Sequence, residues 1–241
     1  MIKIFQIGFN KTGTVSINSF LNMNGIKSIH NDGGKLAKRM YSNAESGLPL
    51  LSGYEKFQGF TDMEYFQPNS GFKYAHVDLF KKLDQEYPNS LFILNIRDVE
   101  AWILSRKKQG QILEKTMHTM GYTEQEVEEY WRQSFYDHIN NVKEHFRTKP
   151  DRLLVYKIDA DKDSLLSDFL VKNGITIDKQ DMVHQHKTDD KQNMHKTNNK
   201  PTPELSVHIN KIRDAAIFLE NEHLDISLRL MEIAASLRPE G

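Results

Sequence analysis

The N-terminal segment, residues 2–21, constrains the fold more than any other part of the chain. Residues 2–9 are mostly apolar, as in a strand buried on both faces, and residues 10–16 are mainly small and polar and include a glycine. Apolar residues then recur at helical spacing over residues 17–21. A strand, a glycine loop and a helix in this order predict an anion site, because loop N–H groups and the positive end of the helix dipole converge there.

The loop differs from the common nucleoside-triphosphate loop in the place of its lysine. Gly8 and Gly13 keep the glycine spacing of a Walker A loop, but Thr14 stands where the lysine belongs, and Lys11 lies inside the loop. This arrangement favours a grip on a terminal anionic group without the usual Mg²⁺ geometry. The alternative is a tight strand-to-helix turn that binds no ligand.

Composition excludes several classes of function. The 241 residues carry a formal net charge of −1, which argues against broad nucleic-acid binding or attraction to an acidic membrane. Cysteine is absent, which excludes disulfides, thiolate metal sites and a cysteine nucleophile and fits a reducing compartment. A strand that begins by residue 2 leaves no room for a signal peptide, and no apolar run reaches the length of a membrane span. We therefore expect a soluble cytoplasmic protein.

Further along, buried strands alternate with helices, which predicts an α/β fold. Strands are predicted over residues 26–30, 57–62, 90–98 and 152–157. Helices are predicted over residues 35–46 and 77–86, after residue 99, behind a capping box of Thr123 and Glu126, and around residues 165–170. His138 and His145 lie on or beside the apolar face of the helix behind that box, and we interpret them as structural. Residues 50–56 and 110–121 carry no firm assignment.

The C-terminal quarter has a different character. Residues 184–203 are rich in Lys, His, Asn and Asp, which fits a solvated polar loop or a lid that closes over an anion through Lys187, Lys191 or Lys196. Residues 204–241 show two apolar stripes, which predict a helical hairpin. The expected organisation is an α/β domain over residues 1–183, the polar loop, and a hairpin that packs on the same domain or on a second subunit of a homodimer.

A second motif follows the clearest interior strand. Arg97 lies at the end of that strand and Ser105 lies eight residues further along the next helix. Arginine offers a planar fork suited to phosphate, and a serine hydroxyl adds a short neutral donor. The alternative is an arginine paired with Asp98 or Glu100, beside an ordinary serine.

Together these motifs resemble those of sulfotransferases. Residues 11–14 match the family's 5′-phosphosulfate loop, although Val15 replaces a usual hydroxyl residue. Arg97 and Ser105 match its 3′-phosphate ligands, although Val99 stands where a proline is common. The resemblance spans about residues 2–175 and implies a three-layer, P-loop-NTPase-like α/β fold with a central, mostly parallel sheet.

The resemblance also implies an activity, the transfer of a sulfuryl group from 3′-phosphoadenosine 5′-phosphosulfate (PAPS) to a hydroxyl or amine acceptor, which leaves 3′-phosphoadenosine 5′-phosphate (PAP). Lys11 would neutralise charge on the leaving phosphate oxygen, Arg97 and Ser105 would anchor the 3′-phosphate, and no metal is needed. The 5′-phosphate and sulfonate oxygens would be held by the N–H groups of Thr12, Gly13, Thr14, Val15 and Ser16.

The sequence motifs identify the general base and the acceptor less clearly than they identify the donor-binding residues. Asp62 follows the strand over residues 57–61 and is our candidate base, with Glu64 and His76 behind it. A small molecule or a carbohydrate would serve as acceptor, and the composition names no particular one. Two rival functions are a P-loop small-molecule kinase and a catalytically degenerate nucleotide-binding module.

Overall fold

The structure of the protein is a computed structural model that describes residues 1–109 and 111–179. The predicted polar loop over residues 184–203, with the candidate lid lysines Lys187, Lys191 and Lys196, and the predicted hairpin over residues 204–241 lie outside the described residues. None of the described helices is both long and apolar enough to cross a membrane.

A parallel sheet forms the centre of the described chain, as the sequence predicts. The strand order is β2-β3-β1-β6-β7. These strands are β1 (Ile4–Gln6), β2 (Ser28–His30), β3 (Gly59–Thr61), β6 (Leu91–Ile96) and β7 (Leu153–Lys157). All pairings in this sheet are parallel, so the carboxyl ends of the strands meet at one edge. A ligand of an open α/β sheet binds at this edge.

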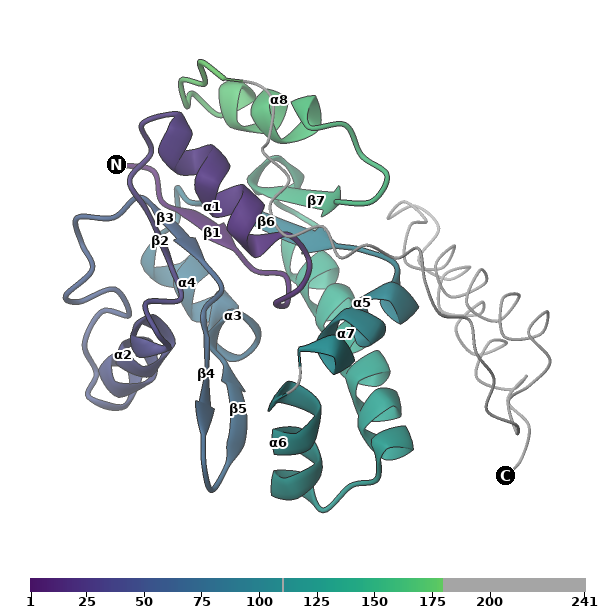
Figure 1. Ribbon diagram of the computed structural model, residues 1–241. Coiled ribbons are helices and arrows are strands. Elements are labelled where there is room, and N and C mark those ends of the chain that lie inside the picture. Colours follow the sequence, from purple (N-terminus) through teal and green to yellow (C-terminus); the bar gives the residue numbers. More distant parts are fainter. Residues whose placement is uncertain (110, 180–241) are drawn as a thin grey trace. The chain divides into compact units, whose positions relative to one another are not determined.

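Helices cover both faces of the sheet, which gives three layers (Figure 1). The helices are α1 (Thr14–Met23), α2 (Lys35–Glu45), α3 (Ala75–Asp78), α4 (Phe80–Glu86), α5 (Val99–Lys108), α6 (Gln111–Met120), α7 (Glu124–Phe146) and α8 (Ser164–Lys172), with a 3₁₀ turn η1 at Pro150–Arg152. On one face Ile4 and Ile93 pack with apolar residues of α1 and α8. On the other face Phe92 packs against Phe146 of α7, with ring centroids 4.7 Å apart and the rings tilted by 45°.

The longest helix begins as predicted. Thr123 accepts a hydrogen bond from the N–H of Glu126, whose carboxylate accepts one from the N–H of Thr123, so the capping box over these two residues is confirmed. The 23-residue helix α7 follows it and places the side chain of His138 in the core. His138 and His145 are structural, as predicted, because each contacts protein groups of another element.

Three parts of the fold depart from the sequence-based prediction. The helix predicted over residues 77–86 is two shorter helices, α3 and α4, because Leu79 leaves the helical region with φ of −115°. Residues 64–67 and 71–74, for which the sequence predicted no strand, pair as an antiparallel hairpin of β4 (Glu64–Gln67) and β5 (Gly71–Tyr74). Helix α6 occupies part of the stretch left unassigned.

A buried carboxylate ties α4 to the end of α7 and the start of β7. The Asp84 side chain is 2% exposed, and it lies 2.9 Å from Nε2 of His145, 2.6 Å from Nζ of Lys149 and 2.5 Å from Nη1 of Arg152. Burial by itself raises the pKa of Asp84, but the hydrogen bonds from Lys149 and His145 and the charge of Arg152 hold that pKa below its usual value. The carboxylate therefore stabilises the fold.

Replacing Asp84 with asparagine should lower the free energy of unfolding by about 2–4 kcal/mol, because three donors lose their anionic partner. Urea denaturation at pH 7 measures the change. The stabilisation is complete above the unfolded pKa, about 4, and is lost as the pH falls through the lower folded pKa. The matched control is Asp151→Asn, in an exposed pair with Lys172, which should change stability little. Equal effects of the two substitutions would contradict the role of Asp84.

Candidate functional site

The predicted anion loop connects β1 to α1 at the carboxyl edge of the sheet. Lys11 and Gly13 adopt left-handed backbone conformations, with φ of 63° and 84°, and α1 begins at Thr14. The N-cap of α1 is Gly13, and no side chain caps the helix. The first amides of a helix have no intrahelical acceptor, so those of Thr14 and Val15 point their donors and the positive helix dipole towards the loop.

A buried hydrogen-bond network lies beneath this loop. The side-chain amide of Asn95, in β6, donates to the carbonyl and the hydroxyl oxygen of Thr12, each at 2.7 Å. Asn95 Oδ1 accepts from the N–H of Gly8 at 3.1 Å and from Nε2 of Gln6 at 2.6 Å. At its other end Gln6 Oε1 accepts from the N–H of Asp62 at 2.8 Å. The network thus connects the loop to the end of β3 across three neighbouring strands.

Gly8 allows the loop to approach β6. A Cβ atom at this position would lie 2.0 Å from the carbonyl oxygen and 2.4 Å from Oδ1 of Asn95. Gly8 is not among the described residues with positive φ. The glycine is therefore required for space, and its conformational freedom is not what the position needs.

The structure brings the two predicted phosphate motifs into contact. Arg97 follows β6 directly, and its Nη1 donates to the carbonyl oxygen of Lys11 at 3.4 Å. Arg97 Nε lies 3.4 Å from Oδ2 of Asp159, a residue just beyond β7. The guanidinium group is thus oriented by the loop on one side and by a carboxylate on the other.

The alternative partners considered for Arg97 are engaged elsewhere. Asp98 is the N-cap of α5, where its Oδ1 accepts from the N–H of Ala101 at 2.8 Å. Glu100 accepts two hydrogen bonds from Arg132 of α7, at 2.8 and 3.1 Å. The alternative that Arg97 forms an ion pair with Asp98 or Glu100 is therefore wrong.

The remaining predicted cofactor residues lie on the loop and on α5. Ser105 is 6% exposed, on the buried side of α5. Thr12 is fully buried, and its hydroxyl donates to the carbonyl oxygen of Phe9, so this hydroxyl belongs to the loop's internal structure. Thr14 and Ser16 are also buried, and Val15 is half-buried.

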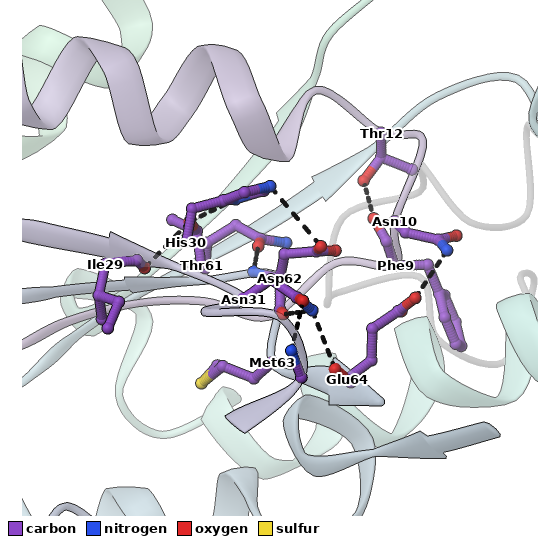
Figure 2. A network of polar contacts seen from close by, with 12 residues as sticks. Phe9, Asn10, Thr12, Ile29, His30, Asn31, Thr61, Asp62, Met63 and Glu64 are labelled. Carbon is purple, nitrogen blue, oxygen red and sulfur yellow. Dashed lines mark hydrogen bonds and ion pairs between the residues drawn. The ribbon is translucent and has the colours of Figure 1, made fainter. Parts of the chain in front are cut away.

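Two carboxyl groups lie beside the loop, as Figure 2 shows. Asp62 follows β3 in a left-handed conformation, with φ of 57°, and Glu64 begins β4. Asn10 Nδ2 donates to Oε1 of Glu64 at 2.7 Å, and Asn31 Nδ2 donates to the carbonyl oxygens of Asp62 and Glu64, each at 2.9 Å. Asn31 thereby fixes the backbone that carries both candidate bases.

The electrostatic surroundings of the two carboxyl groups differ. Burial raises the pKa of Asp62, and the charges of His30, Lys11 and Arg106 act in the opposite direction. Burial, and then the charge of Asp62, raise the pKa of Glu64. The Asp62 side chain is 16% exposed, whereas Glu64 is buried, so Asp62 is the better placed of the two to meet an acceptor.

His30, like Gln6 and Asn95, is a residue of this site that the sequence analysis missed. It is the last residue of β2, and its Nε2 lies 3.6 Å from Oδ2 of Asp62. Its position at the end of a predicted strand was the available signal, because ligands of open α/β sheets meet the carboxyl ends of the strands.

The third candidate base, His76, lies in the core. It is fully buried, and its ring contacts those of Phe9, Tyr74 and His138 at centroid distances of 5.3, 5.6 and 5.8 Å. Burial lowers the pKa of His76 to about 3 and that of His138 to about 4. His138 Nε2 contacts the carbonyl oxygen of Ile7 at 2.6 Å and so holds the end of β1 that leads into the loop.

Within residues 1–109 and 111–179, no group of three or more His, Asp or Glu side chains is arranged as a metal site.

Comparison with known families gives one relevant match. Residues 3–119, just under half of the chain, match a family model described as a sulfotransferase domain. The matched region runs from the residue before β1 into α6 and contains the loop, Asp62, Arg97 and Ser105. No curated protein sequence matches the chain.

The substitution Gly8→Ala should lower the free energy of unfolding by at least about 3 kcal/mol, because the new methyl group would displace backbone atoms of β6. Chemical denaturation measures the loss. Gly25→Ala is the control. Gly25 has φ of 73° and open space around it, so this substitution should lower the free energy of unfolding by only about 1 kcal/mol. A smaller cost at Gly8 than at Gly25 would show that the close approach to Asn95 is unimportant.

Acid should weaken the fold through His138. The unfolded chain binds a proton as the pH falls through about 6.5, whereas the folded histidine does so near pH 4, so its stabilisation is full above pH 6.5 and is lost on acidification. In His138→Gln, whose amide can still donate to Ile7, the loss of unfolding free energy between pH 7 and pH 5 should be smaller by about 2 kcal/mol. The exposed His118 provides the control, His118→Gln, with an unchanged pH dependence. The same pH dependence of the unfolding free energy in both variants would exclude His138 as the cause of the acid sensitivity.

Proposed function

We infer that this chain, whose residues 3–119 match a sulfotransferase domain, is a sulfotransferase that transfers a sulfuryl group from PAPS to a hydroxyl or amine acceptor and releases PAP. The observation that carries the proposal is the contact between Arg97 and the carbonyl oxygen of Lys11. It joins two motifs that are far apart in the sequence, each of which suits an anion.

The proposed donor site uses both motifs for one nucleotide. The uncapped N-terminus of α1 and the loop amides would hold the 5′-phosphate and the sulfonate oxygens. Arg97, supported by Ser105, would hold the 3′-phosphate through its planar fork of donors. Asp159 already orients Nε of Arg97, which reduces the conformational freedom that binding would otherwise remove.

The proposed reaction is an in-line displacement in which positioning and charge stabilisation dominate. A bond forms between the acceptor oxygen or nitrogen and sulfur while the bond between sulfur and the bridging phosphate oxygen breaks. The bonding electron pair leaves with the phosphate oxygen, where Lys11 would neutralise the charge. The acceptor gives up one proton, which Asp62 would take as the general base.

Calorimetric titration tests the proposal against its rivals. Tight binding of PAP without metal supports the sulfotransferase, whereas a preference for ATP with Mg²⁺ would identify a P-loop kinase acting on a small molecule. Binding of neither would favour a degenerate nucleotide-binding module. Donor turnover is then assayed with radiolabelled PAPS, and transfer to a panel of carbohydrates and small hydroxyl or amine compounds identifies the acceptor.

Replacing Arg97 with alanine should weaken PAP binding about 10- to 100-fold, the equivalent of losing a charge-assisted hydrogen bond. The affinity for adenosine 5′-phosphate, which lacks the 3′-phosphate, should fall by less than about 3-fold in the same variant. Calorimetry on both ligands measures the difference. Arg147→Ala, which removes an arginine from an exposed pair with Glu144, is the control and should change neither affinity. Equal losses for the two ligands would remove the anchoring role of Arg97.

A further inference from the structure

His30 and Asp62 lie side by side because of strand register. His30 pairs with Thr61 in the parallel ladder between β2 and β3, and Asp62 is the next residue along the chain. The Nε2 atom of His30 is 3.6 Å from Oδ2 of Asp62, which is within ion-pair distance. The side chains are 27% and 16% exposed, respectively, so this pair lies where the sheet edge meets solvent.

Both ring nitrogens of His30 face groups that accept hydrogen bonds. Its Nδ1 lies 3.0 Å from Oγ1 of Thr61, and the Thr61 hydroxyl donates its own proton to the carbonyl oxygen of Ile29 at 3.3 Å. With its one proton directed to Ile29, the Thr61 oxygen is available to accept from Nδ1–H. Nε2 faces a carboxylate oxygen. His30 therefore lies between a hydroxyl oxygen on its Nδ1 side and a carboxylate, at ion-pair distance, on its Nε2 side.

Asp62 needs such a partner because of where it lies. Its Oδ1 is buried and makes no hydrogen bond within the described part of the chain, which disfavours the ionised carboxylate. The charged groups that face it are Lys11 from the loop, Arg106 from α5, His30 from β2 and, with the same sign as Asp62, Glu64 from β4. Of the three cations, His30 is the one with an ion-pair contact to Asp62.

The backbone of Asp62 is held firmly while its side chain meets His30. Gln6 accepts from its N–H at 2.8 Å, and Asn31, the residue after His30, donates to its carbonyl oxygen at 2.9 Å. Figure 2 shows the side chains of His30 and Asp62 directed towards each other. The backbone of Asp62 is therefore held by β1 and by the turn after β2, while its carboxylate faces His30.

We propose that His30 is a positioning residue that, as a cation held between Thr61 and Asp62, keeps the Asp62 carboxylate charged and aimed at the acceptor. This rests on the proposed function for the reaction that Asp62 serves. The acceptor proton moves to the Asp62 carboxylate as the new bond to sulfur forms, and it passes to solvent after PAP leaves. His30 itself contributes charge and orientation and does not contact the reacting atoms.

The experiment compares His30→Gln with the unaltered full-length chain by two independent measurements. The first is ¹³C NMR of the Asp62 carboxyl group during a pH titration of the protein without ligand, assigned by loss of the signal in Asp62→Asn. Because His30 opposes the effect of burial on Asp62, the midpoint should move to higher pH in His30→Gln. An unchanged or lower midpoint would overturn the proposal, whatever the activity of the protein.

The second measurement is release of radiolabelled sulfate from PAPS with water as the acceptor. In His30→Gln the rising limb of the pH–rate profile should move to higher pH, so that the rate falls most at low pH and recovers at high pH. A loss by the same factor at every pH would indicate a merely structural role. In an Asp62→Asn background, where the rate falls about 10²- to 10⁴-fold, His30→Gln should add nothing.

Two further variants complete the design. Thr61→Val keeps the shape of Thr61 but removes the acceptor for Nδ1–H, and it should move the Asp62 midpoint in the same direction by a smaller amount. His118→Gln, an exposed histidine on α6, should leave both readouts unchanged. Calorimetry with PAP tests the proposed function separately: a shifted carboxyl midpoint without PAP binding would uphold the His30–Asp62 pair and reject the sulfotransferase reaction.

Discussion

The site depends on the buried hydrogen bonds that connect Thr12, Asn95, Gln6 and Asp62 across the carboxyl edge of the sheet. Each amide uses both its oxygen and its nitrogen, and a buried polar group left without a partner costs about 1–3 kcal/mol, so the network is specific for one arrangement of the three strands. The anion loop and the candidate base therefore have a fixed relation to each other even though 50 residues separate Thr12 from Asp62. Gly8 is needed for the same reason, because the network forms only where loop and strand nearly touch.

The charged side chains around Asp62 and Glu64 come from several different helices, strands and loops. Arg106 is 1% exposed, and its guanidinium lies 4.8 and 4.4 Å from the ring centroids of Trp102 and Trp131. It donates to the Tyr74 hydroxyl at 2.7 Å and lowers the pKa of the nearby carboxyl groups. The two core histidines stay neutral because burial lowers their pKa. The cationic side chains at this edge of the sheet are those of Lys11 and Arg97, and they lie beside the His30–Asp62 pair.

Local patterns in the sequence predicted much of this structure. The run of apolar residues in β6 and the capping box before α7 predicted those elements, and the spacing from Gly8 to Gly13 predicted the loop. The hairpin of β4 and β5 was missed because Pro68 and Gly71 mark a turn without revealing that short, half-exposed flanking segments pair. Asn95 and Gln6 were missed as site residues because polar residues in a buried strand acquire partners only from neighbouring strands. His30 lies at the end of a predicted strand, but its contact with Asp62 depends on the register between β2 and β3, which the local sequence does not reveal.

The position of β1 in the middle of the sheet has a consequence for synthesis. Ile4 pairs with Gly59 on one side and with Leu91 on the other, so during synthesis this strand has no partner until residues 59 and 91 have emerged. Asn95, which holds the loop, comes later still. The segment therefore cannot make its native β-pairings until those later strands have been synthesised. The predicted anion loop precedes its partners in the chain and takes its final form only after they are present.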